Sequence, residues 1–229
     1  METNLDNWRV FDWPDSPLFD KRYKIGTSDV PGDGSCYFHS VIKARSLNYR
    51  NKSRKEKQLM IRHWRHDLSL LLSKRMDFLS KENSSQIGDG TYYDFLSNGQ
   101  LASFAKDYKP SGLREMQNEL NSSSPVDNTY NEYISNLLNI NIFMIDYVKR
   151  DLYVIGDDID LLIKPDRLSI CLLVIPGHYQ LVGIQYPDSF GVITQFSFTH
   201  PFIVKLLLRW RELVSRGSEG KAIYSDNIV

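Results

Sequence analysis

A proline and two glycines precede a cysteine within residues 31–39, and this stretch constrains the chain more than any other. Pro31, Gly32 and Gly34 favour a tight loop, because glycine can adopt a positive φ angle and proline cannot continue a helix. An apolar-periodic run begins at Cys36, which predicts a helix that starts at the cysteine. The positive end of that helix would lie at the sulfur and favour thiolate over thiol. The stretch therefore predicts a reactive cysteine at a loop-to-helix junction.

A cysteine of this kind is activated by a basic partner, and His178 is the histidine best placed for that role. Pro176 and Gly177 separate two apolar runs, which predicts a tight turn with His178 at the first position of the next strand. Because strand side chains alternate, Gln180 lies on the same face and could orient the imidazole through its amide oxygen. An upstream acid such as Asp29, or backbone and water, could orient the ring instead.

The hydrophobic period changes from helical to strand-like near residue 139. We expect a helix from Cys36 into the basic stretch 43–57, and further helices at 56–73, 92–105, 111–120 and 130–138. Short apolar runs then predict strands at 140–146, 152–155 and 168–175 and from His178 onward, of which the first two should pair. This order predicts an α+β fold, with a small central sheet late in the chain, helices flanking it and the cysteine at a helix N-terminus.

The 229 residues are enough for one domain with extensions. Residues 1–24 carry aromatic residues such as Trp13 among prolines and aspartates, and we expect an irregular extension packed on the domain. Residues 25–186 form the predicted catalytic domain. Residues 187–229 add a loop and an amphipathic helix, whose apolar stripe around Trp210 should pack on the domain because it would otherwise face water.

Charge and composition exclude several kinds of partner and site. The 28 basic and 28 acidic residues give a net charge of 0, so nothing points to nucleic acid or an anionic membrane. Only two cysteines are present, and Cys171 lies in an apolar strand, where we expect an inert core thiol. His63 and His66 lie one helical turn apart, but no further ligand completes a metal site. We expect no metal and no cofactor, and no catalytic role for His39, His63, His66 or His200.

The N-terminus lacks the basic-then-apolar order of a signal peptide. No apolar run approaches the roughly 18 residues that a membrane span requires. Together with the low cysteine content, these features predict a cytoplasmic protein that acts as a monomer without a membrane partner.

Residues 33–39 resemble the Asp-Gly-x-Cys-aromatic-Phe-His/Arg signature of the OTU (ovarian tumour) cysteine proteases, most of which are deubiquitinases. Residues 177–179 resemble the His-aromatic motif of the same family. The resemblance extends over roughly residues 25–186, and the free-standing OTU proteases of viruses, or of bacteria that act inside host cells, are the most similar members. The chain departs from the family at Gln180, where members usually carry Asp or Asn, and at residues 127–128, where many carry Trp-Gly.

The resemblance implies a thiol-dependent hydrolase that cleaves (iso)peptide bonds after the Gly-Gly tail of ubiquitin. It implies Cys36 as nucleophile, His178 as base and Asp33 as the residue that holds the loop in shape. Because the family carries Asp or Asn at residue 180, the resemblance does not settle the orienting residue, for which the strand pattern favours Gln180. Ubiquitin and polyubiquitin chains are the implied partners, and an apolar surface near residues 92–104 is the expected docking surface. The expected location is the cytoplasm, which is that of the host cell if the protein is viral or an injected effector. Two alternatives are an inactive OTU-like module that only binds ubiquitin, and a Cys–His hydrolase for another ubiquitin-like modifier.

Overall fold

The computed structural model describes residues 2–74, 91–94, 112–126, 130–153 and 163–225. Its helices are α1 (Cys36–Arg45), α2 (Leu47–Arg50), α3 (Arg54–Leu71), α7 (Leu113–Asn121), α8 (Asn131–Leu138) and α10 (Pro201–Ser225). Its strands are β1 (Glu2–Thr3), β2 (Trp8–Val10), β3 (Lys24–Ser28), β4 (Ile140–Asp146), β5 (Asp151–Leu152), β6 (Leu168–Ile175), β7 (His178–Gln185) and β8 (Val192–Ile193). The α+β class predicted from the sequence is confirmed.

A mixed sheet, eight-stranded in the described part of the chain, forms the centre of the molecule. Its order is β1-β8-β7-β6-β4-β5, while β3 pairs with β7 and β2 with β3. Strands β4 and β6 run parallel, and β4 pairs antiparallel with β5, as predicted. Strands β6 and β7 form an antiparallel hairpin whose turn contains Gly177 at a φ of 74°. A positive φ at this position explains why the turn uses glycine.

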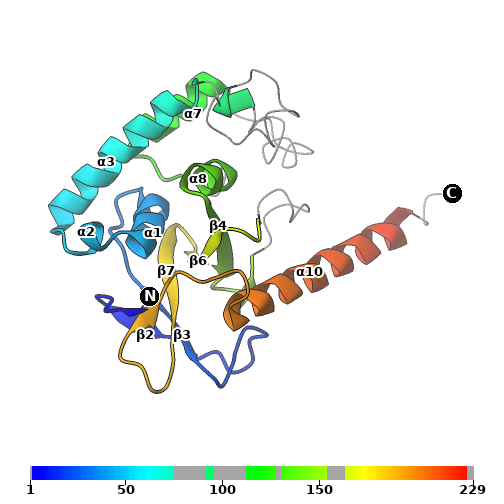
Figure 1. The fold of residues 1–229 in the computed structure, drawn as a ribbon. Coiled ribbons are helices and arrows are strands. Elements are labelled where there is room, and N and C mark those ends of the chain that lie inside the picture. Colours follow the sequence, from blue (N-terminus) through cyan, green and yellow to red (C-terminus); the bar gives the residue numbers. More distant parts are fainter. Residues whose placement is uncertain (1, 75–90, 95–111, 127–129, 154–162, 226–229) are drawn as a thin grey trace.

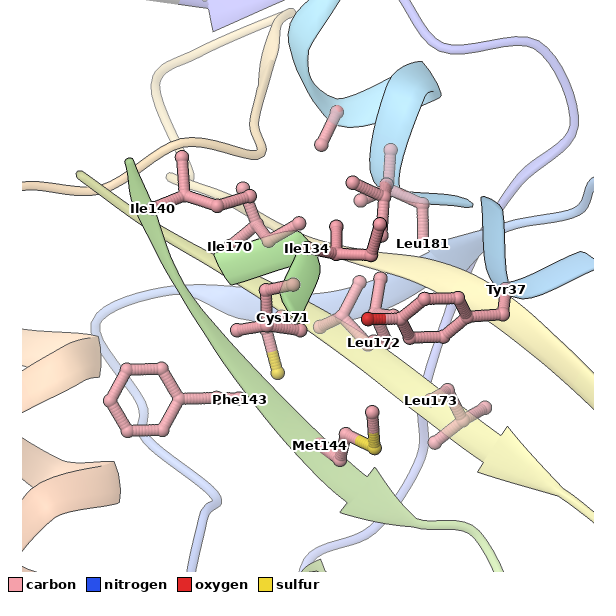
Figure 2. Close-up of a cluster of buried hydrophobic side chains, with 14 of the residues drawn as sticks. Tyr37, Ile134, Ile140, Phe143, Met144, Ile170, Cys171, Leu172, Leu173 and Leu181 are labelled. Atoms are coloured by element: carbon pink, nitrogen blue, oxygen red, sulfur yellow. The ribbon is translucent and has the colours of Figure 1, made fainter. Parts of the chain in front are cut away.

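Helices cover both faces of the sheet. Helices α1, α3, α7 and α8 lie on one side and α10 lies on the other (Figure 1). The core between them is continuous, and Figure 2 shows Cys171 on β6 within it, with Phe143 and Leu172 as neighbours in the cluster. Burial raises the pKa of the Cys171 thiol, because a buried thiolate would lose its hydration. The predicted core position of Cys171 is confirmed, and its inertness stays a prediction.

The chain ends contribute more to the sheet than the sequence predicts. The N-terminal extension was expected to be irregular, yet β1 pairs with β8 and β2 pairs with β3. Leu18 and Tyr23 from the same extension are buried in the core. These strands are only two or three residues long, too short to show a period in the sequence. All three predicted segments contribute strands to the one sheet. The boundaries at residues 24 and 186 stay a prediction.

The expected helix at 92–105, and with it the docking surface near 92–104, falls mainly on residues 95–111, which lie outside the described ranges. Residues 127–128, where the chain departs from the OTU pattern, lie outside them as well. Within the described ranges, no helix has both the length and the apolar character needed to cross a membrane.

Basic residues at the end of α1 and at the end of α2 hydrogen-bond to backbone carbonyls. Lys43 donates to the Asp29 carbonyl at 2.5 Å, Arg45 donates to the Leu138 carbonyl, and Arg50 donates to the Lys43 carbonyl at 2.7 Å. Burial lowers the pKa of Lys43 to about 8, because the ammonium group is held away from water. Part of this basic stretch therefore holds the fold together, and Lys43 fixes the backbone at Asp29.

Candidate active site

Cys36 is the first residue of α1, as the sequence predicts, and a tight loop leads into it. Gly34 has a φ of 80°, and an added Cβ would lie 2.1 Å from the Ser123 carbonyl oxygen, so only glycine fits there. The Asp33 carboxylate accepts the backbone N–H of Ser35 at 3.1 Å and closes the loop. The expected role of Asp33 in shaping the loop has its geometric basis in this bond, and its effect on activity stays a prediction.

His39 supports the same loop from inside the molecule, a role that the sequence analysis missed. This fully buried side chain places Nε2 at 3.1 Å from the Asp33 carboxylate and Nδ1 at 2.6 Å from the Tyr49 hydroxyl. Burial lowers the pKa of His39 and outweighs the opposing pull of Asp33, so the ring is neutral at pH 7. Since a carboxylate only accepts, Nε2 carries the proton and Nδ1 accepts the hydroxyl. His39 is therefore part of the support for Asp33.

Two tyrosines bring the cysteine and the histidine to the same place. Tyr37, the residue after Cys36, meets Tyr179, the residue after His178, edge to face at 5.5 Å between ring centroids. The backbone N–H of Tyr179 also hydrogen-bonds to the Cys36 thiol. These contacts fix the start of α1 against the start of β7, so the two candidate catalytic residues are placed by directly adjacent aromatic side chains.

Cys36 and His178 line one cleft of about 550 Å³. The β6–β7 turn forms one side of it, and Val148, 70% exposed, stands on the turn between β4 and β5. The remaining wall residues include Glu119, Pro125, Val126, Asp146 and Lys149. The Cys36 side chain thus lies on the wall of an open cleft.

The acceptor beside the histidine is Asp29, the upstream acid that the sequence left open as an alternative to Gln180, and the role of Gln180 stays a prediction. The His178 Nε2 lies 2.9 Å from the Asp29 carboxylate. The Gln180 amide nitrogen donates to that same carboxylate oxygen at 3.1 Å, and the Val30 N–H donates to it at 2.9 Å. Because Asp29 can only accept, His178 Nε2 carries the proton and Nδ1 is left as the basic nitrogen. Gln180 thus contacts the carboxylate that contacts His178.

Strand pairing explains why the acid comes from so far upstream. Strands β3 and β7 are antiparallel, with Ser28 opposite Leu181, so the next residue on β3's path, Asp29, comes opposite Gln180. Burial would raise the pKa of Asp29, but the hydrogen bonds from His178, Val30 and Gln180 and the charge of His178 outweigh it and lower the pKa. Asp29 is therefore ionised at neutral pH and able to hold the imidazole.

The resting state of the thiol differs from the expected thiolate. Burial raises the pKa of Cys36, and the N–H groups of Tyr179, Tyr37 and Cys36 itself, which act in the opposite direction, do not compensate for it. The N–H groups at the helix start do favour thiolate, as the sequence predicts, but the loss of hydration is larger. The raised pKa favours the neutral thiol over the thiolate.

A buried arginine beneath the loop is the second feature that the sequence analysis missed. Arg65 of α3 donates to the Ser35 hydroxyl at 2.7 Å, directly before Cys36. The sequence shows it only as one of several basic residues in an amphipathic helix, without any signal that it points inward. Its helical spacing from the apolar residues Ile61 and Leu68 is the one sequence feature that places it on the buried face of α3.

Comparison with known proteins finds no matching family model and no matching curated protein. Solved structures do match, and OTU domains are among them. An OTU domain solved in complex with ubiquitin is 16% identical, with a TM-score of 0.47 over 84% of this chain and 86% of that one. The Hazara virus OTU bound to ubiquitin is 12% identical, with a TM-score of 0.32 over 78% and 96% of the two chains. The viral OTU domain protease of Qalyub virus is 10% identical, with a TM-score of 0.33 over 77% and 98%.

Proposed function

We propose that this protein is a cysteine deubiquitinase of the OTU type, which hydrolyses the bond after the C-terminal Gly-Gly of ubiquitin. The observation that carries the proposal is the placement of Cys36 and His178 on one cleft, each within a segment that resembles an OTU motif. Asp29 supplies the carboxylate that such a pair uses to hold the imidazole.

The first half of the reaction forms a thioester. The Cys36 sulfur adds to the carbonyl carbon of the terminal glycine while its proton passes to Nδ1 of His178. The carbonyl oxygen becomes an oxyanion, for which backbone N–H groups of the loop before Cys36 are the candidate donors. His178 then gives the proton to the lysine nitrogen as the carbon–nitrogen bond breaks, and ubiquitin remains on the sulfur.

The second half releases ubiquitin. Water replaces the departed amine, His178 takes a proton from it, and the resulting hydroxide adds to the thioester carbon. The tetrahedral intermediate collapses with cleavage of the carbon–sulfur bond, and the proton held by His178 returns to the sulfur, which restores the Cys36 thiol. The ubiquitin carboxyl group loses its own proton to water and leaves as the carboxylate. Asp29 stays ionised throughout and stabilises the imidazolium that forms twice in the cycle.

Ubiquitin carrying an electrophile at its C-terminus tests the proposal directly. We expect it to label Cys36, which intact-mass analysis and peptide mapping would locate, and to spare Cys171. Labelling by a probe built on another Gly-Gly modifier, but not by ubiquitin, would favour the hydrolase for that modifier. Binding of ubiquitin without any labelling would favour the inactive binding module.

Replacing Asp29 by alanine should lower kcat/KM for a ubiquitin substrate by about 10²-fold, because the imidazole loses the acceptor that sets its orientation and tautomer. Gln180→Ala removes only one of the three donors to Asp29, so we expect a loss of about tenfold or less. Steady-state kinetics of both variants decide the order. A larger loss in Gln180→Ala than in Asp29→Ala would return the orienting role to Gln180.

A further inference from the structure

Arg65 is a charged residue that the fold buries almost completely, at 2% exposure. Its guanidinium donates to the Ser35 hydroxyl at 2.7 Å and to the Gly34 carbonyl at 3.4 Å, both on the loop that leads to Cys36. The cation also lies 5.3 Å from the centre of the Phe38 ring. On this side, therefore, Arg65 holds the loop that precedes the nucleophile.

The same guanidinium holds one wall of the catalytic cleft. It donates to the carbonyls of Leu120 at 3.0 Å, Glu119 at 2.7 Å and Ser124 at 3.2 Å. The first two carbonyls lie at the C-terminal end of α7, where the helix dipole favours a cation. Glu119 and the neighbouring Pro125 line the cleft. One side chain thus ties the nucleophile loop to the surface over which a substrate tail would pass.

The bonding pattern is specific for arginine. The five acceptors are served by Nε, by Nη1 twice and by Nη2 twice, which matches the five N–H donors that a guanidinium carries. A lysine has three donors on one nitrogen and cannot reach acceptors on two separate segments in this way. Burying a charge is costly unless every donor is satisfied, so the site is built around this side chain.

The position of the loop matters because its N–H groups are the candidate oxyanion donors. The Ser35 N–H is already taken by Asp33, whereas the Gly34 N–H has no hydrogen-bond partner in the described part of the chain. Oxyanion donors act only from about 2.7–3.1 Å, and a displacement of about 1 Å can cost about 10²-fold in rate. Asp33 holds Ser35 at its N–H and Arg65 holds it at its hydroxyl, so the loop is restrained against such a displacement.

We propose that Arg65 is a positioning residue for the oxyanion: it fixes the loop before Cys36 against the cleft wall, so that the loop amides face the developing negative charge. This inference rests on the proposed function and adds to it a residue that touches neither substrate nor sulfur. Arg65 also links the cleft wall at Glu119 to the loop, so one side chain fixes the positions of the wall and of the loop.

Two variants test the proposal with ubiquitin C-terminal aldehyde as the probe. The Cys36 sulfur adds reversibly to the aldehyde carbon and the thiol proton ends on the oxygen, which then occupies the oxyanion position. Ser35→Ala removes one acceptor and leaves Arg65 its other four, and we expect aldehyde affinity and kcat to fall about tenfold. Arg65→Lys should lower both by about 10²-fold.

The affinity for unmodified ubiquitin and the rate of Cys36 alkylation by iodoacetamide, which forms no oxyanion, should stay unchanged in Ser35→Ala.

Arg50→Lys is the matched control, because Arg50 also donates to backbone carbonyls, those of Lys43 and Ala44, at the far end of α1. It should leave aldehyde affinity unchanged. If wild-type protein binds the aldehyde and Ser35→Ala and Arg65→Lys bind it equally well, Arg65 has no positioning role. A parallel loss of aldehyde affinity, ubiquitin affinity and thermal midpoint in Ser35→Ala would reduce it to a structural role and overturn the proposal. Failure of the wild type to bind the aldehyde would instead overturn the proposed function, and this inference with it.

Discussion

Replacing Cys36 by alanine is expected to reduce cleavage of ubiquitin chains by about 10⁴-fold or more, because no other group on the cleft can form the thioester. The variant should fold normally, since alanine is a good residue for the first turn of a helix and the thiol makes only weak hydrogen bonds. Gel-based cleavage of polyubiquitin measures the activity, and thermal unfolding measures the fold. The affinity for uncleaved chains should be retained.

Cys171→Ser is the matched control for this experiment. The residue is fully buried on β6, and a hydroxyl there loses its hydration without gaining a partner among the apolar neighbours. We expect a lower free energy of unfolding, by about 1–3 kcal/mol, and unchanged kcat in the folded fraction. Persistent cleavage by Cys36→Ala, or its loss in correctly folded Cys171→Ser, would remove Cys36 from the role of nucleophile.

Replacing His178 by alanine should lower kcat at neutral pH by about 10³-fold or more, because Cys36 then has no group to take its proton during attack. The raised pKa of Cys36 adds a second, more discriminating expectation for the free protein. Below its pKa the thiolate fraction, and with it the rate of alkylation by iodoacetamide, should rise about tenfold for each unit of pH between 6 and 8. His178→Ala should show that same profile while losing turnover.

The presence or absence of a plateau in the alkylation rate against pH distinguishes two ways of activating the cysteine. A preformed thiolate–imidazolium pair would make alkylation of the wild type level off well below pH 8, and His178→Ala would abolish that plateau. A neutral thiol that loses its proton only during attack gives no plateau in either protein. Measuring the rates with purified protein at fixed ionic strength decides between them, and a plateau in the wild type would contradict the buried, neutral thiol.

Local sequence patterns predict much of the candidate site. The glycine at residue 34, the helix that begins at Cys36 and the turn at Gly177 follow from backbone preferences of a few neighbouring residues. The buried strands β4 and β6 follow from continuous apolar runs. In each case the information lies within about ten residues of the feature, where periodicity and turn chemistry are readable.

The features of the site that local sequence patterns leave open, or do not predict at all, depend on contacts between distant segments. Asp29 reaches His178 only through the β3–β7 register, and nothing in the sequence around Asp29 indicates its partner strand. Arg65 points inward because its acceptors are the ends of α7 and of the nucleophile loop, which meet only in the folded chain. The raised pKa of Cys36 likewise reflects burial, a property of the whole fold. Tertiary placement therefore decides the orienting acid and the charge state.

The β3–β7 pairing also determines when the candidate site can be complete during synthesis. Asp29 and His178 are 149 residues apart, so the acid and the base can meet only after β7 has left the ribosome. At about 5–20 residues per second, the nucleophile and its loop would emerge roughly 7–30 s before the histidine. Long-range pairing of this kind also forms late in folding, because the loop-closure entropy has to be overcome first. A partly synthesised chain would thus carry Cys36 without Asp29 and His178 paired beside it, and the proposed hydrolysis would require the completed β3–β7 pairing.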